Sequence, residues 1–87
     1  MPRLEKTIIV RTKQGLHARP AAMFVQIANK FDSTVVVRRA EEEVNGKSIM
    51  GILMLGANHH CKVILIADGD DADAAIIDLE GFLKKSE

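Results

Sequence analysis

The stretch that leads from the first strand into the first helix reads GLHARPA and occupies residues 15–21. The run before it is rich in β-branched residues, which favour a strand, and the run after it repeats apolar residues at helical spacing. Gly15 permits a tight turn, and Pro20 suits the first turn of a helix, where a missing N–H costs no intrahelical hydrogen bond. The sequence therefore predicts that His17 lies at a helix N-terminus, beside free backbone N–H groups.

A histidine in that position is suited to carrying a phosphoryl group. The positive end of the helix dipole and the guanidinium of Arg19 disfavour the imidazolium form, so the ring of His17 keeps a lone pair for attack on phosphorus. Once the phosphoryl group is attached, the first helical N–H groups and Arg19 can donate hydrogen bonds to its oxygens. The alternative, which a lone His-x-Arg-Pro would favour, is that His17 only caps the helix.

A second motif, NGKSIMGILMLG at residues 45–56, predicts a short helix that Ser48 caps at its N-terminus. Residues 46–48 are similar to the end of a phosphate-binding P-loop, but Glu41 stands where the full pattern needs a glycine, so no nucleotide site is predicted. Four apolar side chains cluster on this helix, and the sequence leaves open whether they pack in the core or are exposed. They are Ile49, Met50, Leu53 and Met54.

Together, the two motifs resemble those of HPr, the histidine-containing phosphocarrier family of the bacterial phosphoenolpyruvate-dependent phosphotransferase system (PTS). The resemblance covers essentially the whole chain, because both motifs stand at the family's separation in a chain of the family's length. It implies that enzyme I phosphorylates His17 on Nδ1 and that the group then passes to a histidine on a IIA domain. It also implies that Arg19 holds the phosphoryl oxygens and that the backbone amides of Ala18 and Arg19 donate hydrogen bonds to them.

Regulation and docking follow from the same resemblance. Ser48 stands where a dedicated ATP-dependent enzyme, HPr kinase/phosphorylase, phosphorylates members of the family. Ile49, Met50 and Leu53 match positions in an exposed apolar patch on which partner enzymes dock. A phosphate on Ser48 would bring negative charge into that patch and slow transfer to His17. The chain is thus expected to be a phosphocarrier, an intermediate rather than a free-standing enzyme. The alternative is a mainly regulatory effector that acts through Ser48 phosphorylation and protein binding.

Length and composition narrow the classes of function. With 87 residues, the chain is expected to form one domain over residues 1–87. The 12 basic and 12 acidic residues cancel, and three aromatic residues occur, all phenylalanine, so nucleic acid is not an expected partner. The N-terminal residues lack an apolar signal-peptide core, and no apolar run approaches the length that spans a bilayer. We therefore expect a cytoplasmic protein with no membrane insertion. We also expect it to be a monomer.

The segment His59-His60-Cys61 raises the question of a metal site. Side chains of adjacent residues in an extended chain point to opposite sides, so at most His59 and Cys61 converge, whereas a structural zinc site takes four ligands. We therefore predict neither a metal nor another cofactor, and a single cysteine excludes an intramolecular disulfide. The HPr family usually carries glycine near position 60, so the chain departs from the family at this turn.

The order of elements predicts an α+β fold. Strands are expected at 4–11, 33–39, 42–46 and 62–67, and helices at 18–31, 48–55 and 71–84. The simplest solution is one small, largely antiparallel sheet with helices on one face. The resemblance implies the same arrangement, the HPr-like open-faced β-sandwich of order β-α-β-β-α-β-α, with a four-stranded antiparallel sheet and three helices on one face. It also implies that the helices that begin beside His17 and Ser48 lie close together.

The two longer helices carry apolar residues at three- and four-residue spacing, which predicts one buried stripe on each. The expected buried residues are Ala21, Phe24, Val25, Ala28 and Phe31 in the first helix and Ala72, Ala75, Ile76, Leu79 and Phe82 in the last. Charges at the ends of the last helix are expected to complement its dipole. They are Asp70, Asp71 and Asp73 at the start and Lys84 and Lys85 at the end.

Overall fold

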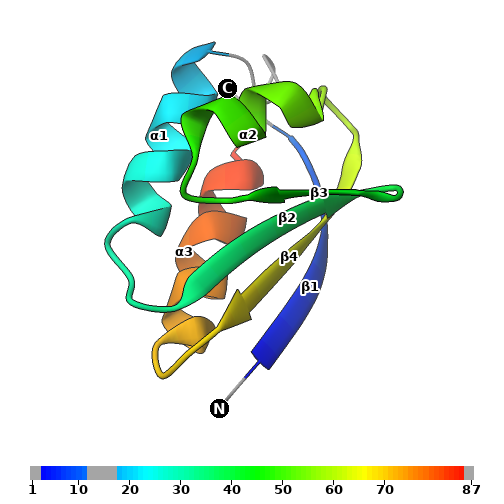
Figure 1. The fold of residues 1–87 in the computed structure, drawn as a ribbon. Coiled ribbons are helices and arrows are strands. Elements are labelled where there is room, and N and C mark those ends of the chain that lie inside the picture. Colours follow the sequence, from blue (N-terminus) through cyan, green and yellow to red (C-terminus); the bar gives the residue numbers. More distant parts are fainter. Residues whose placement is uncertain (1–2, 12–17, 86–87) are drawn as a thin grey trace.

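The structure is a computed structural model that describes residues 3–11 and 18–85 (Figure 1). Its elements follow the predicted order: β1 (Arg3–Ile9), α1 (Ala18–Ala28), β2 (Thr34–Arg39), β3 (Glu42–Asn45), α2 (Ile49–Leu55), β4 (Lys62–Asp68) and α3 (Ala72–Leu83). In these two ranges, no helix is both long enough and apolar enough to cross a membrane.

The four strands form one antiparallel sheet in the order β1-β4-β2-β3. Strand β4 is central: Ile64 pairs with Thr7 of β1, and Leu65 pairs with Val37 of β2. The three helices lie on the same side of the sheet, and its other side is open (Figure 1). The predicted α+β architecture, a four-stranded antiparallel sheet with three helices on one face, is therefore confirmed.

The core lies between the sheet and the helices. On β4, alternate residues Val63, Leu65 and Ala67 are buried, because successive side chains of a strand point to opposite faces. The predicted stripe of α3 is buried throughout, and so is that of α1 from Ala21 to Ala28. Phe31 is half-buried and lies beyond the end of α1, so its predicted place on the helix was wrong.

Two predicted boundaries were wrong by more than one residue. Helix α1 ends at Ala28 because the hydrogen bonds beyond it change to the 3₁₀ spacing of three residues. The Lys30 amide donates to the Ile27 oxygen at 3.1 Å, and the Phe31 amide donates to the Ala28 oxygen at 3.2 Å. The regular ladder of β1 ends at Ile9 instead of residue 11. Val10 still exchanges hydrogen bonds with the segment around His60, but the left-handed backbone of His60 (φ 72°) ends the regular pairing.

The start of α3 is anchored to the turn before β2. Asp71 is the N-cap residue, yet its carboxylate makes no cap hydrogen bond. It accepts instead from the backbone amides of Asp32 and Ser33, each at 2.9 Å, and from the Ser33 hydroxyl. These hydrogen bonds hold the pKa of the Asp71 carboxyl below its ordinary value. The Ser33 hydroxyl makes the largest contribution, and the Asp32 amide comes second. Of the three acidic residues expected to complement the helix dipole, Asp73 is the one in the first turn.

Candidate functional site

The first turn of α1 presents the donors that the sequence predicts for a phosphoryl group. Ala18 and Arg19 are its first two residues, and both are exposed. Their backbone N–H groups belong to the first four of the helix, which have no intrahelical acceptor. The first turn of α1 holds no acidic residue, so the positive end of the helix dipole is not neutralised within the helix. This end of α1 therefore favours a bound anion, and Arg19 adds a positive charge to the same turn.

His17 and Gly15 fall within residues 12–17, outside the described residues. The prediction that His17 is the phosphorylated residue therefore stays a prediction about the residue that directly precedes α1. The segment before this interval is fixed to the sheet and to α3: Val10 donates to the Cys61 oxygen at 2.8 Å, and Arg11 donates to the Leu83 oxygen at 2.7 Å.

Ser48 caps α2, as the sequence predicts. Its backbone is extended (φ −115°, ψ 118°), and its hydroxyl oxygen accepts from the Gly51 amide at 3.0 Å. The neighbouring Lys47 extends away from this end and donates its ammonium to the Phe31 carbonyl at 2.7 Å. Ser48 is partly buried, and the cap uses one of the two lone pairs of its hydroxyl oxygen.

The glycines around Ser48 have packing roles. A Cβ at Gly46 would lie 2.5 Å from a methyl carbon of Val35, and a Cβ at Gly51 would lie 3.2 Å from the Asn45 carbonyl oxygen. Gly46 therefore leaves room for the Val35 side chain, and Gly51 lets the backbone of α2 approach the Asn45 carbonyl. Each residue of 46–48 thus has a structural role: Gly46 in packing, Lys47 in its bond to Phe31 and Ser48 in the cap.

The C-terminal end of α2 is held by an arginine whose role the sequence did not predict. Gly56 adopts a left-handed conformation (φ 68°) and ends the helix. Arg39, at the end of β2, donates to the Leu55 carbonyl at 2.8 Å and to the Cys61 sulfur at 3.1 Å. It thereby links the last turn of α2 to the segment before β4. No local pattern around Arg39 indicates this role.

Helix α2 contains no polar side chain, yet it buries only Ile52 and Leu55. Its other large side chains form an exposed apolar surface, here called the α2 surface. Its members and their exposed fractions are Ile49 at 46%, Met50 at 68%, Leu53 at 40% and Met54 at 74%. The alternative that Leu53 or Met54 belongs to the core is therefore wrong.

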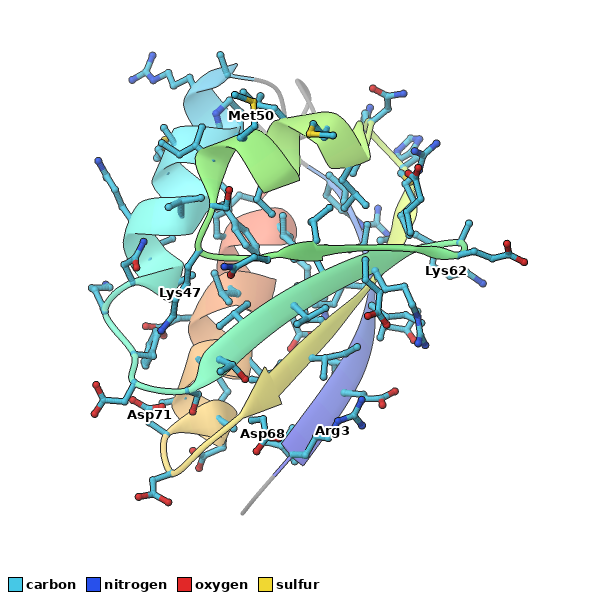
Figure 2. All side chains as sticks on the ribbon, in the orientation of Figure 1. Arg3, Lys47, Met50, Lys62, Asp68 and Asp71 are labelled. Carbon is cyan, nitrogen blue, oxygen red and sulfur yellow. The ribbon has the colours of Figure 1, made fainter. Side chains whose placement is uncertain are left out.

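The α2 surface lies next to the start of α1. The two helices pack against each other, and Figure 2 shows Met50 on the side of α2 that adjoins the first turns of α1. Met23 of α1 is 43% exposed and extends the apolar character onto that helix. Exposed apolar side chains gathered on neighbouring helices are typical of a protein-binding surface. Met23 is not among the predicted docking residues, although its place off the buried stripe of α1 could have indicated its exposure.

The turn at residues 59–61 gives no indication of a metal centre. The rings of His59 and His60 lie with their centroids 3.7 Å apart and their planes tilted by 32°, and the Cys61 sulfur accepts a hydrogen bond from Arg39. Among the residues that the structure describes, no group of three or more His, Cys, Asp or Glu side chains could hold a metal ion. His60 takes up the left-handed conformation that glycine adopts most readily.

Comparison with known proteins assigns the family. A family model described as "PTS HPr component phosphorylation site" matches residues 4–85. The chain belongs to the HPr family. Phosphocarrier protein HPr of Haloferax volcanii is 45% identical to it over 86 residues, which cover 97% of each chain. The HPr resemblance of the sequence is thereby confirmed.

Solved HPr structures share the fold. The crystal structure of HPr from Bacillus anthracis superposes with a TM-score of 0.92 at 36% identity and covers 95% of this chain and 99% of that chain. The crystal structure of Crh from Bacillus subtilis, a catabolite repression protein described as a dimer with a swapping domain, superposes with a TM-score of 0.78 at 41% identity and covers 95% of each chain. The open-faced β-sandwich of HPr proteins is the fold of this chain.

Proposed function

We propose that this HPr-family chain is a phosphocarrier that accepts a phosphoryl group on Nδ1 of His17 from phospho-enzyme I and passes it to a histidine of a IIA domain. In each step, the bond from phosphorus to the donor group breaks as a bond to the acceptor nitrogen forms. The observation that carries the proposal is the exposed start of α1, where Ala18 and Arg19 directly follow His17, together with the packing of α1 against α2, the helix that carries Met50. Arg19 and the first amides stabilise the charge on the phosphoryl oxygens.

Enzyme I and the IIA domain dock in turn on Ile49, Met50 and Leu53. Successive partners need brief contacts over a small area, so a weak interface suits the exchange. Met50 adapts its unbranched side chain to differently shaped partners. The partners are proteins, with neither nucleic acid nor membrane insertion involved, and the exchange takes place in the cytoplasm. The chain acts as a monomer in this scheme. Because Crh is described as a dimer, the molecular mass of this chain in solution should be measured to test whether it is a monomer.

Ser48 is the proposed regulatory site, phosphorylated by an HPr kinase/phosphorylase. A phosphate on its oxygen would stand at the N-terminal end of α2, where the helix dipole favours negative charge. It would also stand beside Ile49 and Met50, so it would disfavour the apolar contact with enzyme I. The similarity to Crh, a catabolite repression protein, favours a second candidate function: a regulatory effector that acts mainly through phosphorylated Ser48. The presence of His17 in the motif favours the carrier function over this second candidate.

The test of the carrier function is phosphorus NMR of the protein with phosphoenolpyruvate, magnesium and enzyme I. The expected result is a phosphohistidine resonance that is lost in His17→Ala and kept in the matched control His59→Ala/His60→Ala, which removes the chain's other two histidines. Acid-labile phosphate retained in His17→Ala would refute the site. No transfer with an active enzyme I would favour the regulatory function, which addition of HPr kinase and ATP to the same sample then tests.

A further inference from the structure

Two of the three methionines within the described residues lie on the α2 surface, where partners are proposed to dock. The chain has four methionines, and the three within the described residues are all exposed: Met23 at 43%, Met50 at 68% and Met54 at 74%. Met50 and Met54 are the two most exposed large apolar side chains of the described residues. They stand four residues apart on α2, so they are neighbours on its surface.

A thioether differs chemically from the aliphatic side chains around it. A peroxide oxidises methionine by two electrons: the peroxide O–O bond breaks, one oxygen forms an S=O bond, and the other leaves as water. The product, methionine sulfoxide, is polar, and sulfoxide reductases return it to the thioether. Ile49 and Leu53 have no sulfur and are inert to the same oxidant. The oxidisable atoms of the α2 surface are therefore the sulfurs of Met50 and Met54.

We propose that Met50 and Met54 are reversible oxidation sites, and that peroxide converts the α2 surface from apolar to polar and blocks the docking of enzyme I. This inference rests on the proposed carrier function, because it concerns the surface through which the carrier meets its donor. A polar sulfoxide that finds no hydrogen-bond partner in an apolar contact weakens that contact. Phosphoryl transfer would then respond to peroxide without any change at His17.

Oxidation of the two methionines is not expected to disturb the core. Beneath the α2 surface, the buried side chains are Ile52 and Leu55, which peroxide does not attack. The ends of α2 are held by the Ser48 cap, the left-handed Gly56 and the Arg39 hydrogen bond to Leu55, and none of these contacts uses a methionine. Oxidation of Met50 and Met54 therefore changes the surface of α2 and leaves its supports in place.

The experiment uses the full chain with Cys61→Ser, which removes the one thiol that peroxide would also oxidise. Samples are treated with hydrogen peroxide, and peptide mass spectrometry locates the added oxygens. The kcat and KM of phosphoryl transfer from enzyme I are then measured before and after treatment. The matched variant carries Met50→Leu/Met54→Leu in the same background, and each protein is compared with its own untreated sample. Thermal unfolding followed by circular dichroism reports whether the oxidised protein remains folded.

We expect the KM of the parent to rise about tenfold or more on oxidation, with a smaller change in kcat, and to recover after treatment with methionine sulfoxide reductase and a dithiol. The Leu variant is expected to keep its own untreated KM after peroxide. An unchanged KM in the doubly oxidised parent, or an equal loss in the Leu variant, would overturn the inference. An untreated parent that enzyme I does not phosphorylate would instead refute the carrier function, and the inference with it.

Discussion

Helices α2 and α3 are both rich in apolar residues, but they use these residues differently. Helix α3 buries six of its residues against the sheet and α1, and Ile77 is its one exposed large apolar side chain. Helix α2 buries two and exposes four. The exposed positions of α3 include Asp73 and Asp78, whereas α2 has no charged residue. The difference indicates that α3 serves the stability of the fold, whereas α2 leaves apolar side chains exposed, on the surface where partners are proposed to dock.

The largest effect expected from this comparison is on stability. Leu79→Ala in α3 removes a fully buried side chain and is expected to lower the free energy of unfolding by about 2–5 kcal/mol. Leu53→Ala in α2 removes a side chain that is 40% exposed and is expected to cost less than about 1.5 kcal/mol. Urea denaturation monitored by circular dichroism measures both. Equal losses of unfolding free energy in the two variants would show that α2 and α3 contribute equally to stability.

An effect on binding comes next. Met50→Gln keeps the length of the side chain and makes it polar, and we expect it to raise the KM for enzyme I about tenfold, or ~1.4 kcal/mol. Its free energy of unfolding should change by about 0.5 kcal/mol or less, because the residue is exposed. The matched control is Ile77→Gln, which makes the same kind of change on α3, where Ile77 is 66% exposed. A rise in KM for both variants would contradict a docking role specific to α2.

The cap of α2 accounts for a smaller share of stability. Ser48→Ala removes the acceptor of the Gly51 amide and is expected to lower the free energy of unfolding by about 1 kcal/mol. Ser48→Thr retains a hydroxyl at the same position and is the matched control. Thermal unfolding of the two variants under identical conditions gives the difference. A Thr variant as unstable as the Ala variant would mean that the hydrogen bond contributes nothing to α2.

The smallest expected effect is a loss of stability at low pH. On α3, the Ser33 hydroxyl lowers the pKa of the Asp71 carboxyl from its ordinary 3.8, and Lys84, followed by Lys6, lowers that of Glu80 from 4.5. Since the folded pKa lies below the unfolded value, each carboxylate contributes stability above the unfolded pKa. That contribution is lost as the pH falls from the unfolded pKa through the lower folded pKa. The unfolding midpoints of wild type and Asp71→Asn should therefore converge as the pH falls below 3.8. A gap that stays constant would contradict this linkage.

How much of the fold the sequence predicts depends on how far apart the interacting residues are in the chain. The Ser48 cap was predicted because its hydroxyl and the Gly51 amide stand three residues apart, within one motif. The Asp71 carboxylate instead accepts from amides 38 and 39 positions away, and Arg39 reaches the Leu55 carbonyl 16 positions away. Such contacts exist only once the sheet has formed, so no local pattern contains them.

The candidate site shows the same limit. The apolar character of α2 is evident from its residues, but the choice of Ile52 and Leu55 as its buried pair depends on how the helix sits over the sheet. This is why the sequence left the burial of Leu53 and Met54 open. Arg19 was predicted from the motif and is exposed at the start of α1, whereas the role of His17 still rests on the motif and on membership of the HPr family.

The most direct test of the account is to map the contact with enzyme I on this chain by NMR. Amide and methyl resonances are followed as enzyme I is added. The account predicts that the perturbed signals belong to Ala18, Arg19 and the α2 surface, and that the strands of the open sheet face are unaffected. Perturbations concentrated on β1 and on Ile64 of β4, with α2 unchanged, would contradict it.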